Sequence, residues 1–292
     1  MFKKILFWTL AVVITLGASV YQRMTGPTHP KNLTANINGV EYSFKLIRSG
    51  GEKDCPIVLK GLGKGDSNIA VKSTNEMQTE AALYWRKYPS QEPFSKIEMQ
   101  PTPNGLTAAL PVQPAAGKLE YYLSIGTKVT GPDGILATNN YYFNDEPLII
   151  RFKGDVPAWV LIPHIFCMFL SMLFAAYALL CAIGKMPQYK KYITIAFWII
   201  VVGGFILGPL VQKYAFDIYW SGFPFGSDLT DNKTLFATIA LLAAVLTKKY
   251  LWNRWVAIAA VLIMFVVFSI PHSMRGSELN HNTGEVISSK IK

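Results

Sequence analysis

The stretch that decides the fold is AWVLIPHIFCMFLSMLFAAYALLCAI, residues 158–183, in which no side chain carries a formal charge. A helix needs about 20 mainly apolar residues to cross the hydrocarbon core of a bilayer. Inside that core every backbone amide and carbonyl must find a partner within the protein, which a helix provides. The stretch therefore predicts a membrane-spanning helix and places the chain among the membrane proteins.

Three further apolar stretches follow, at about 192–212, 231–247 and 253–272. The stretch at 231–247 is short for a span, so we expect its helix to begin near Thr230-Asp231, because Thr and Asp are favourable N-cap residues. Lys248 and Lys249 can extend their ammonium groups to water at the other end. Together the four stretches predict a four-helix transmembrane bundle over residues 157–274, followed by a polar tail at 275–292.

The N-terminus predicts a fifth hydrophobic segment. Met-Phe-Lys-Lys precedes an uncharged run from Ile5 to Gln22. The small residues at 17–19 would suit a signal peptidase, but Val20 and Tyr21 are poor residues just before a cut. We therefore expect residues 1–24 to form an uncleaved signal-anchor helix, with a cleaved signal peptide as the alternative.

The positive charge of the chain is concentrated in its short loops. The 292 residues have a net charge of +10, only 16% are charged, and the mean hydropathy is +0.27. Eight cations lie in three segments without an acid: Lys3, Lys4, Lys185, Lys190, Lys191, Lys248, Lys249 and Arg254. Short basic loops stay in the cytoplasm, whereas a nucleic-acid-binding face would spread over a soluble domain. The charge therefore predicts a topology with a cytoplasmic N-terminus, and it excludes a nucleic-acid partner.

Between the anchor and the bundle, residues 31–154 follow the two-residue period of β-strands. Val40, Tyr42, Phe44 and Leu46 alternate with polar residues, directly after the turn signal Asn38-Gly39. Seven or eight short strands separated by Gly, Pro and Asn clusters are typical of a β-sandwich. With the N-terminus inside, this all-β domain and the C-terminal tail are expected on the outer side.

Three stretches in this region carry a resemblance. They are LYWR at 83–86, IEM at 97–99 and LPVQPAAGKLEYYL at 110–123. Their proline-bounded connection and the glycine before a strand with paired aromatics resemble bacterial immunoglobulin-like or fibronectin-III-like modules. The resemblance implies an Ig-like sandwich, and it implies no particular ligand, because such sandwiches serve many functions.

Three other segments of the chain are similar to an uncharacterised family of bacterial inner-membrane proteins. They are YQRMTGP at 21–27, IRFKGDVP at 150–157 and the stretch 219–234. This similarity implies a signal anchor, an Ig/fibronectin-III-like periplasmic domain and a four-helix transmembrane region in the inner (plasma) membrane. The resemblance implies no activity. The topology inferred from the basic loops places the C-terminus in the periplasm or outside the cell.

The three cysteines do not form a disulfide framework. Cys167 and Cys181 lie within one apolar segment, and Cys55 stands alone in the β-rich region. We expect three small buried apolar side chains, since free cysteine is among the most buried residue types.

The expected outer loop at 217–234 is rich in aromatic residues. Trp220, Phe223 and Phe225 suit a membrane interface or a protein contact, so we predict them to form an interaction surface. The neighbouring glycines and proline at 222–226 indicate a fixed turn.

Two histidines permit a haem hypothesis. His164 lies about two turns inside the first main span and His272 lies at the end of the last one. A pair of histidines is the minimal ligand set for a b-type haem. The alternative is that His164 is neutral and hydrogen-bonded to a neighbouring helix, and that His272 lies at the membrane interface. The two residues lie at different depths in the membrane, which favours this alternative over a shared haem.

Polar residues expected on the outer side of the membrane suggest a metal site as a second hypothesis. Asp228, Asp231, His272 and Glu278, with His164 as a possible addition, would supply oxygen and imidazole ligands for zinc or another divalent ion. No HExxH or comparable spacing supports it. The alternative is that Asp228 and Asp231 stabilise the N-terminus of the following helix.

The sequence therefore predicts a multi-domain membrane protein without an assigned reaction. We expect a non-enzymatic accessory or assembly subunit of a larger membrane complex, without a cofactor, in contact with the bilayer and with a membrane or periplasmic protein. The alternative is a membrane metal-dependent hydrolase or a b-haem redox protein that uses the outer-face His and Asp residues.

Overall fold

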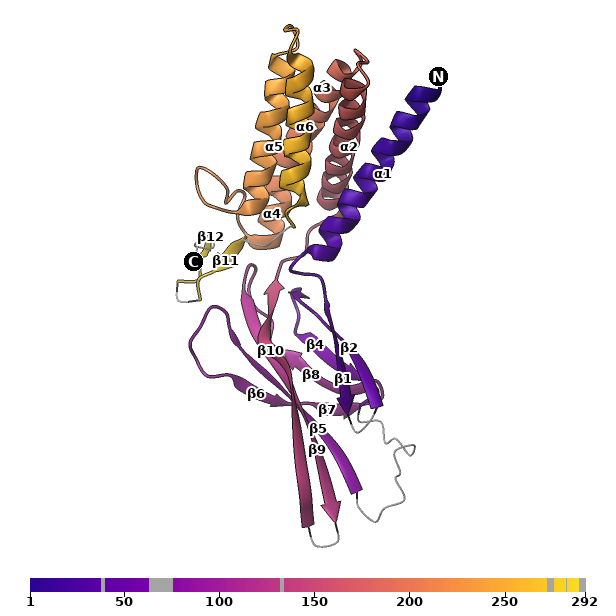
Figure 1. The fold of residues 1–292 in the computed structure, drawn as a ribbon. Helices are drawn as coiled ribbons and strands as arrows, with labels where there is room; N and C mark the ends of the chain where they lie inside the picture. Colours follow the sequence, from indigo (N-terminus) through magenta and orange to yellow (C-terminus); the bar gives the residue numbers. More distant parts are fainter. Residues whose placement is uncertain (38–39, 63–75, 132–133, 272–275, 282, 289–292) are drawn as a thin grey trace. The chain divides into compact units, whose positions relative to one another are not determined.

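A computed structural model describes residues 1–37, 40–62, 76–131, 134–271, 276–281 and 283–288 (Figure 1). The chain divides into two compact units. The helical unit comprises Met1–Pro27, Gly154–Asn280 and Glu285–Lys292, and the β unit comprises Thr28–Lys153 with His281–Gly284. The expected combination of apolar helices with a β-rich region is thereby confirmed.

The helical unit contains α1 (Phe2–Thr25), α2 (Ala158–Ile183), α3 (Tyr189–Ile200), the π-helix η1 (Val201–Leu207), α4 (Gly208–Phe216), α5 (Leu229–Leu246) and α6 (Asn253–Ser269). The short strands β11 (Ser277–Leu279) and β12 (Val286–Ser288) pair with each other. Among the described residues, four helices are long and apolar enough to cross a membrane: α1, α2, the continuous helix Tyr189–Phe216, and α5. At 17 residues, α6 is shorter.

Small residues bring these helices together. Alanines from α2, α3, α5 and α6 are buried in one core: Ala175, Ala178, Ala182, Ala196, Ala237, Ala244, Ala257 and Ala260. Because lipid tails are as apolar as leucine, helices in a bilayer associate by close packing, which small side chains allow. The segment η1 uses glycine in this way, since a Cβ on Gly203 would lie 2.7 Å from the Cβ of Cys167 on α2.

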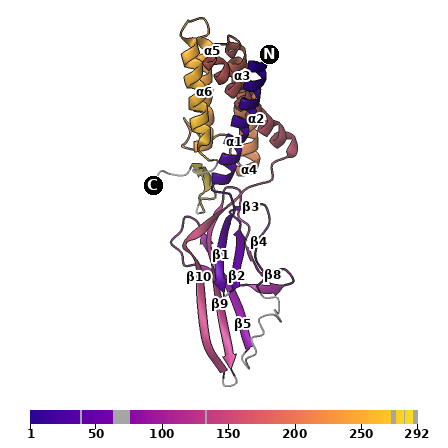
Figure 2. The ribbon, with the colours of Figure 1, turned by 45° about the vertical axis from the view of Figure 1, so that its right-hand side comes forward.

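The first helix belongs to the same core and runs beside α2 (Figures 1 and 2). The ring of Trp8 stacks on Tyr177 with centroids 4.0 Å apart. Near the other end of α1, Gln22 Nε2 donates a hydrogen bond of 3.0 Å to the carbonyl of Phe268 on α6. The N-terminal segment is therefore an integral part of the helical unit.

The β unit consists of ten strands among its described residues: β1 (Lys31–Ile37), β2 (Val40–Leu46), β3 (Ser49–Gly50), β4 (Cys55–Lys60), β5 (Glu76–Lys87), β6 (Ser95–Glu98), β7 (Gln100–Thr102), β8 (Gly105–Leu110), β9 (Lys118–Gly131) and β10 (Gly134–Phe152). They form a five-stranded sheet in the order β3-β10-β9-β5-β6, a three-stranded sheet β4-β8-β7 and the pair β1-β2. Among the pairings of the described strands, only that of β3 with β10 is parallel. The expected Asn38-Gly39 turn lies outside the described residues, and the flanking strands pair from Ile37 opposite Val40.

One hydrophobic core is shared by all three sheets. On β9, alternate residues from Leu119 to Ile125 are buried, as the two-residue period of a strand requires. They pack in the same cluster as Leu59 of β4 and Leu110 of β8 from the three-stranded sheet, and Phe44 of β2. The expected alternation is therefore present, and the finer assignment to an Ig-like sandwich stays a prediction.

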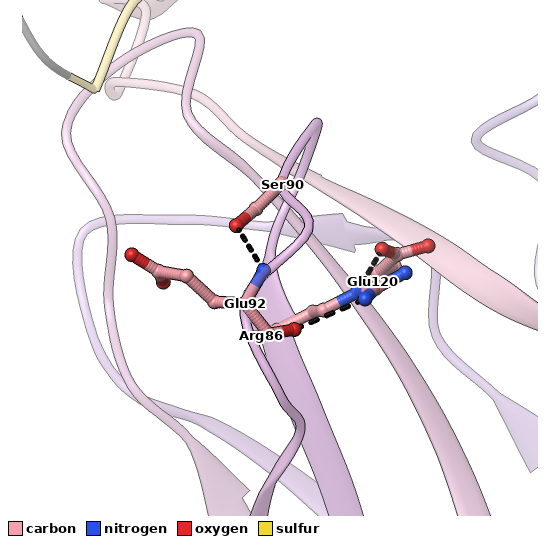
Figure 3. Close-up of polar contacts among 4 residues, drawn as sticks. All are labelled: Arg86, Ser90, Glu92 and Glu120. Atoms are coloured by element: carbon pink, nitrogen blue, oxygen red, sulfur yellow. Dashed lines mark hydrogen bonds and ion pairs between the residues drawn. The ribbon is translucent and has the colours of Figure 1, made fainter.

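An arginine ties the connection between β5 and β6 to the five-stranded sheet (Figure 3). Arg86 Nε donates to Glu120 on β9, and Nη1 donates to the carbonyl of Glu92 at 3.0 Å. The backbone amide of Glu92 donates to Ser90 Oγ at 3.0 Å. The guanidinium also lies 4.3 Å from the ring centroid of Phe94. Because a buried carboxylate requires a partner, Arg86 compensates the nearly inaccessible Glu120.

The only cysteine of the β unit is buried at the start of β4. A Cβ added to Gly50 would lie 2.9 Å from the Cys55 sulfur, so the thiol is closely packed. Burial raises the pKa of the Cys55 thiol, and Asp54 raises it further.

We expect Cys55 to resist alkylation in the folded protein, because the thiolate is the reactive form. In a variant with Cys167 and Cys181 replaced by alanine, maleimide at neutral pH should modify Cys55 slowly, and rapidly after denaturation. Mass spectrometry of the intact chain measures both rates. Equal rates in the native and denatured protein would contradict the packing described.

Candidate functional site

The connection between α4 and α5, residues 217–228, is organised around Ser221. The buried carboxylate of Asp231 accepts a hydrogen bond of 2.7 Å from the backbone amide of Ser221 and lies 3.3 Å from its hydroxyl. The hydroxyl also lies 3.2 Å from Asp228 Oδ2. Ser221, Asp228 and Asp231 are all buried. We call these three residues the Ser221 cluster.

Asp228 joins three elements of the helical unit. Its Oδ1 accepts from the backbone amide of Thr230 at 2.7 Å, and its Oδ2 accepts from the amide of Ser277 on β11 at 3.1 Å. The first bond makes Asp228 the N-cap of α5, which begins at Leu229. The expected start near Thr230-Asp231 is thus corrected by two residues, because the capping carboxylate precedes the first helical residue.

The loop passes very close to the first turn of α5. A Cβ on Gly222 would lie 2.6 Å from the Cβ of Asp231, so only glycine fits there. Asn232 Oδ1 accepts from the backbone amide of Phe223 at 2.7 Å, and Gln212 Nε2 donates to Ser221 Oγ at 2.8 Å. Together with the Ser221 amide bound to Asp231, the Phe223 amide fixes the backbone of the loop at two positions, 221 and 223.

A buried lysine lies in the same turn of α5. Lys233 Nζ donates at 2.7 Å to the carbonyl of Ile270, the C-cap residue of α6. An ammonium group at a helix C-terminus satisfies a free carbonyl and opposes the negative end of the helix dipole. Asp228 also attracts this charge electrostatically. Lys233 therefore connects the start of α5 with the end of α6.

Two phenylalanines of the same loop are exposed. Phe223 is 67% exposed and Phe225 is 83% exposed. Beneath them, Trp220 stacks on Phe205 at 5.5 Å between centroids and its Nε1 donates to the carbonyl of Phe223 at 3.1 Å. We call Phe223, Pro224 and Phe225 the aromatic loop tip. It is an apolar surface on a hydrogen-bonded base.

The structure brings together part of the predicted metal set. Asp228 and Asp231 meet at Ser221, and Glu278 is half-buried on β11, next to Ser277. His272 lies outside the described residues. Within the described part of the chain, no group of three or more His, Cys, Asp or Glu side chains could hold a metal ion. The metal site that includes His272 stays a prediction.

His164 lies on α2, where its Nδ1 is 2.9 Å from the carbonyl of Gly203 in η1. A neutral imidazole that carries its proton on Nδ1 donates this bond. His164 therefore makes the hydrogen bond to a neighbouring helix that is the alternative to a role as haem ligand. Because His272 is outside the described residues, the bis-histidine haem also stays a prediction.

Several residues of the site were missed by sequence reasoning. Ser277 lies 56 positions after Ser221, yet their hydroxyl oxygens are 3.0 Å apart. Gln212 and Lys233 also had no assigned role. The only local signal for this site was the presence of Asp228 and Asp231 at a helix start, with Gly222 in the preceding loop.

The helices define the class of this protein, which is a membrane protein that also carries a β-rich unit. The chain matches no protein-family model, no curated protein and no solved structure.

Proposed function

We propose that this protein is a non-enzymatic accessory or assembly subunit of a bacterial inner-membrane complex. The aromatic loop tip contacts a neighbouring membrane protein at the membrane surface. The β unit is an Ig-like module that binds or braces a periplasmic partner. The observation that carries the proposal is the contrast between two buried carboxylates that accept backbone amides, Asp228 and Asp231, and the exposed phenylalanines of the loop that they hold.

The carboxylates act on the backbone of their own chain. Thr230, Ser277 and Ser221 each donate a backbone amide to Asp228 or Asp231. A general base must reach a proton of its substrate, and a metal ligand must offer a free lone pair. Oxygens that already accept backbone amides support a role in shaping the loop.

The aromatic loop tip has the properties of a binding surface. Aromatic side chains carry much of the binding energy at protein interfaces when they enter a partner's pocket. A loop that is already ordered loses little conformational freedom on binding. The hydrogen bonds at Ser221 and Phe223 supply that order.

The distribution of charge supports the proposed orientation. Lys190 Nζ donates at 2.7 Å to the carbonyl of Lys248, which joins two of the three basic segments. The ring of Phe7, close to Lys3 and Lys4, lies beside Gly184 at the end of α2. The rule that basic loops stay inside favours a cytoplasmic location for this end. The aromatic loop tip follows the opposite end of the helix Tyr189–Phe216 and is then periplasmic.

A photo-reactive phenylalanine analogue at position 225 tests the proposal in native membranes. We expect a discrete protein adduct that disappears when Phe223 is replaced by serine, while the thermal stability of the purified variant is unchanged. The matched control places the analogue at Phe166, an exposed position within α2, where only lipid adducts are expected. Only lipid adducts at position 225, or an adduct insensitive to Phe223→Ser, would contradict a protein contact at the loop tip.

A further inference from the structure

The helical unit gathers positive charge at one end. The basic end comprises Lys3, Lys4, Lys185, Lys190, Lys191, Lys248, Lys249 and Arg254. Its segments are distant in sequence and are joined by the Lys190–Lys248 hydrogen bond and by the Phe7–Gly184 contact. Arg254 also lies close enough to Tyr189 to interact with it electrostatically. Tertiary structure therefore turns three short runs into one basic surface.

No acidic residue is available nearby in the sequence to neutralise this surface. Residues 1–40, 156–216 and 232–277 contain neither Asp nor Glu. The acids of the helical unit precede α2, lie in the α4–α5 connection and the first turn of α5, or follow α6, so none lies in the loops that carry the basic end. Any counter-charge must come from outside these segments.

Two helix N-termini add to the positive potential. The helices α3 and α6 begin at Tyr189 and Asn253, and neither has a side-chain cap or an acid in its first turn. Instead Lys190, Lys191 and Arg254 occupy those first turns. Cations are unfavourable at the positive end of a helix dipole, whereas anions are stabilised there.

Lys190 and Lys248 come from different basic segments, and the ammonium group of Lys190 donates a hydrogen bond to the backbone carbonyl of Lys248. Lys190 uses one ammonium hydrogen on the carbonyl of Lys248 and has two left, and Lys248 has three donors of its own. Burial lowers the pKa of Lys248, and the neighbouring charge of Lys190 lowers it further. A bound anion between them would relieve that repulsion.

We propose that the basic end is a binding site for the phosphate of an anionic phospholipid, with Lys190 and Lys248 as its principal ligands. Three exposed aromatic side chains follow Lys248 closely in the sequence: Tyr250, Trp252 and Trp255. Tyrosine and tryptophan mark the headgroup level of a membrane, which is the level of lipid phosphates. Basic residues next to membrane helices attract anionic lipids. The inference depends neither on the orientation nor on the partner proposed above.

Binding of phosphatidylglycerol to the full-length protein in neutral detergent, followed by native mass spectrometry, tests the site. We expect tighter binding of phosphatidylglycerol than of phosphatidylcholine, which has a phosphate but no net charge. Lys190→Gln and Lys248→Gln should each weaken phosphatidylglycerol binding by about fivefold, the effect of one lysine near an anionic membrane surface. Lys190→Arg should retain the binding.

The matched control is Lys60→Gln, an exposed lysine on β4 in the β unit, which should leave lipid binding unchanged. All variants are compared at equal thermal stability, and Lys248→Gln tests the site if Lys190→Gln fails to fold. Equal affinity for the two lipids, or equal losses in Lys60→Gln and Lys190→Gln, would overturn the proposal. Displacement of the lipid by equimolar inorganic phosphate would also overturn it and indicate a site for free phosphate.

Discussion

Replacing Gly105 by alanine is expected to destabilise the β unit by about 3 to 5 kcal/mol, within the range of severe single substitutions. Gly105 opens β8 with φ at +128°, a conformation that side chains rarely adopt. A Cβ there would lie 2.1 Å from the carbonyl oxygen of Leu59 and 3.0 Å from the Cα of Lys60. Both obstacles are backbone atoms of β4, so no change of rotamer can relieve the clash.

The measurement is hydrogen–deuterium exchange of the full-length protein, read on peptides that cover β4 and β8. We expect loss of protection where Lys60 pairs with Gly105, together with a lower unfolding temperature. Gly51→Ala is the matched control, because a Cβ at Gly51 would meet nothing within 4 Å. If Gly105→Ala behaved like Gly51→Ala, the pairing of β4 with β8 would be wrong at this end.

Replacing Asp228 by alanine is expected to cost about 2 to 4 kcal/mol of the stability of the helical unit. Loss of an N-cap costs about 1 kcal/mol. The amide of Ser277 would in addition lose its carboxylate acceptor in a buried environment, which costs about 1 to 3 kcal/mol. Asp228→Asn should cost less, because asparagine is also a good N-cap and keeps one acceptor oxygen.

Reversible denaturation in detergent micelles measures these losses. Asp217→Asn is the matched control from the same loop, since Asp217 is 73% exposed, pairs with Lys213 at 2.6 Å and has a left-handed backbone that asparagine tolerates. An exposed ion pair contributes little to stability, so no measurable change is expected there. A loss in Asp217→Asn as large as that in Asp228→Ala would show that Asp228 has no special role in holding the loop.

Much of the helical unit was predictable because a bilayer requires an apolar segment of a certain length whose backbone hydrogen bonds are satisfied within a helix. The stretch 158–183 has no charge and spans the required length, and α2 has the same bounds. The continuous helix Tyr189–Phe216 begins earlier and ends later than the expected 192–212, because hydropathy does not register the polar turns at helix ends. The π-helical segment η1 was not anticipated, since glycines at 203 and 204 signal close packing only once the neighbouring helices are known.

The candidate site was predictable only in its local part. Asp228 and Asp231 stand at the start of a helix, and their stabilisation of the helix N-terminus depends only on the next few residues. The sequence therefore indicated this role, as the alternative to a metal site. Ser277 and Lys233 depend on partners that are 49 and 37 positions away, Asp228 and Ile270. No periodicity encodes such distances.

The amino-acid sequence by itself determined that this chain is a membrane protein with a β-rich region, because hydrophobic length and strand alternation act on neighbouring residues. It also determined which loops are basic, since charge is a property of composition. Only the tertiary structure decided that the aspartates at 228 and 231 close around Ser221 and that Lys190 meets Lys248. These contacts exist because the helices pack in one specific arrangement, and that arrangement follows from side chains far apart in the chain.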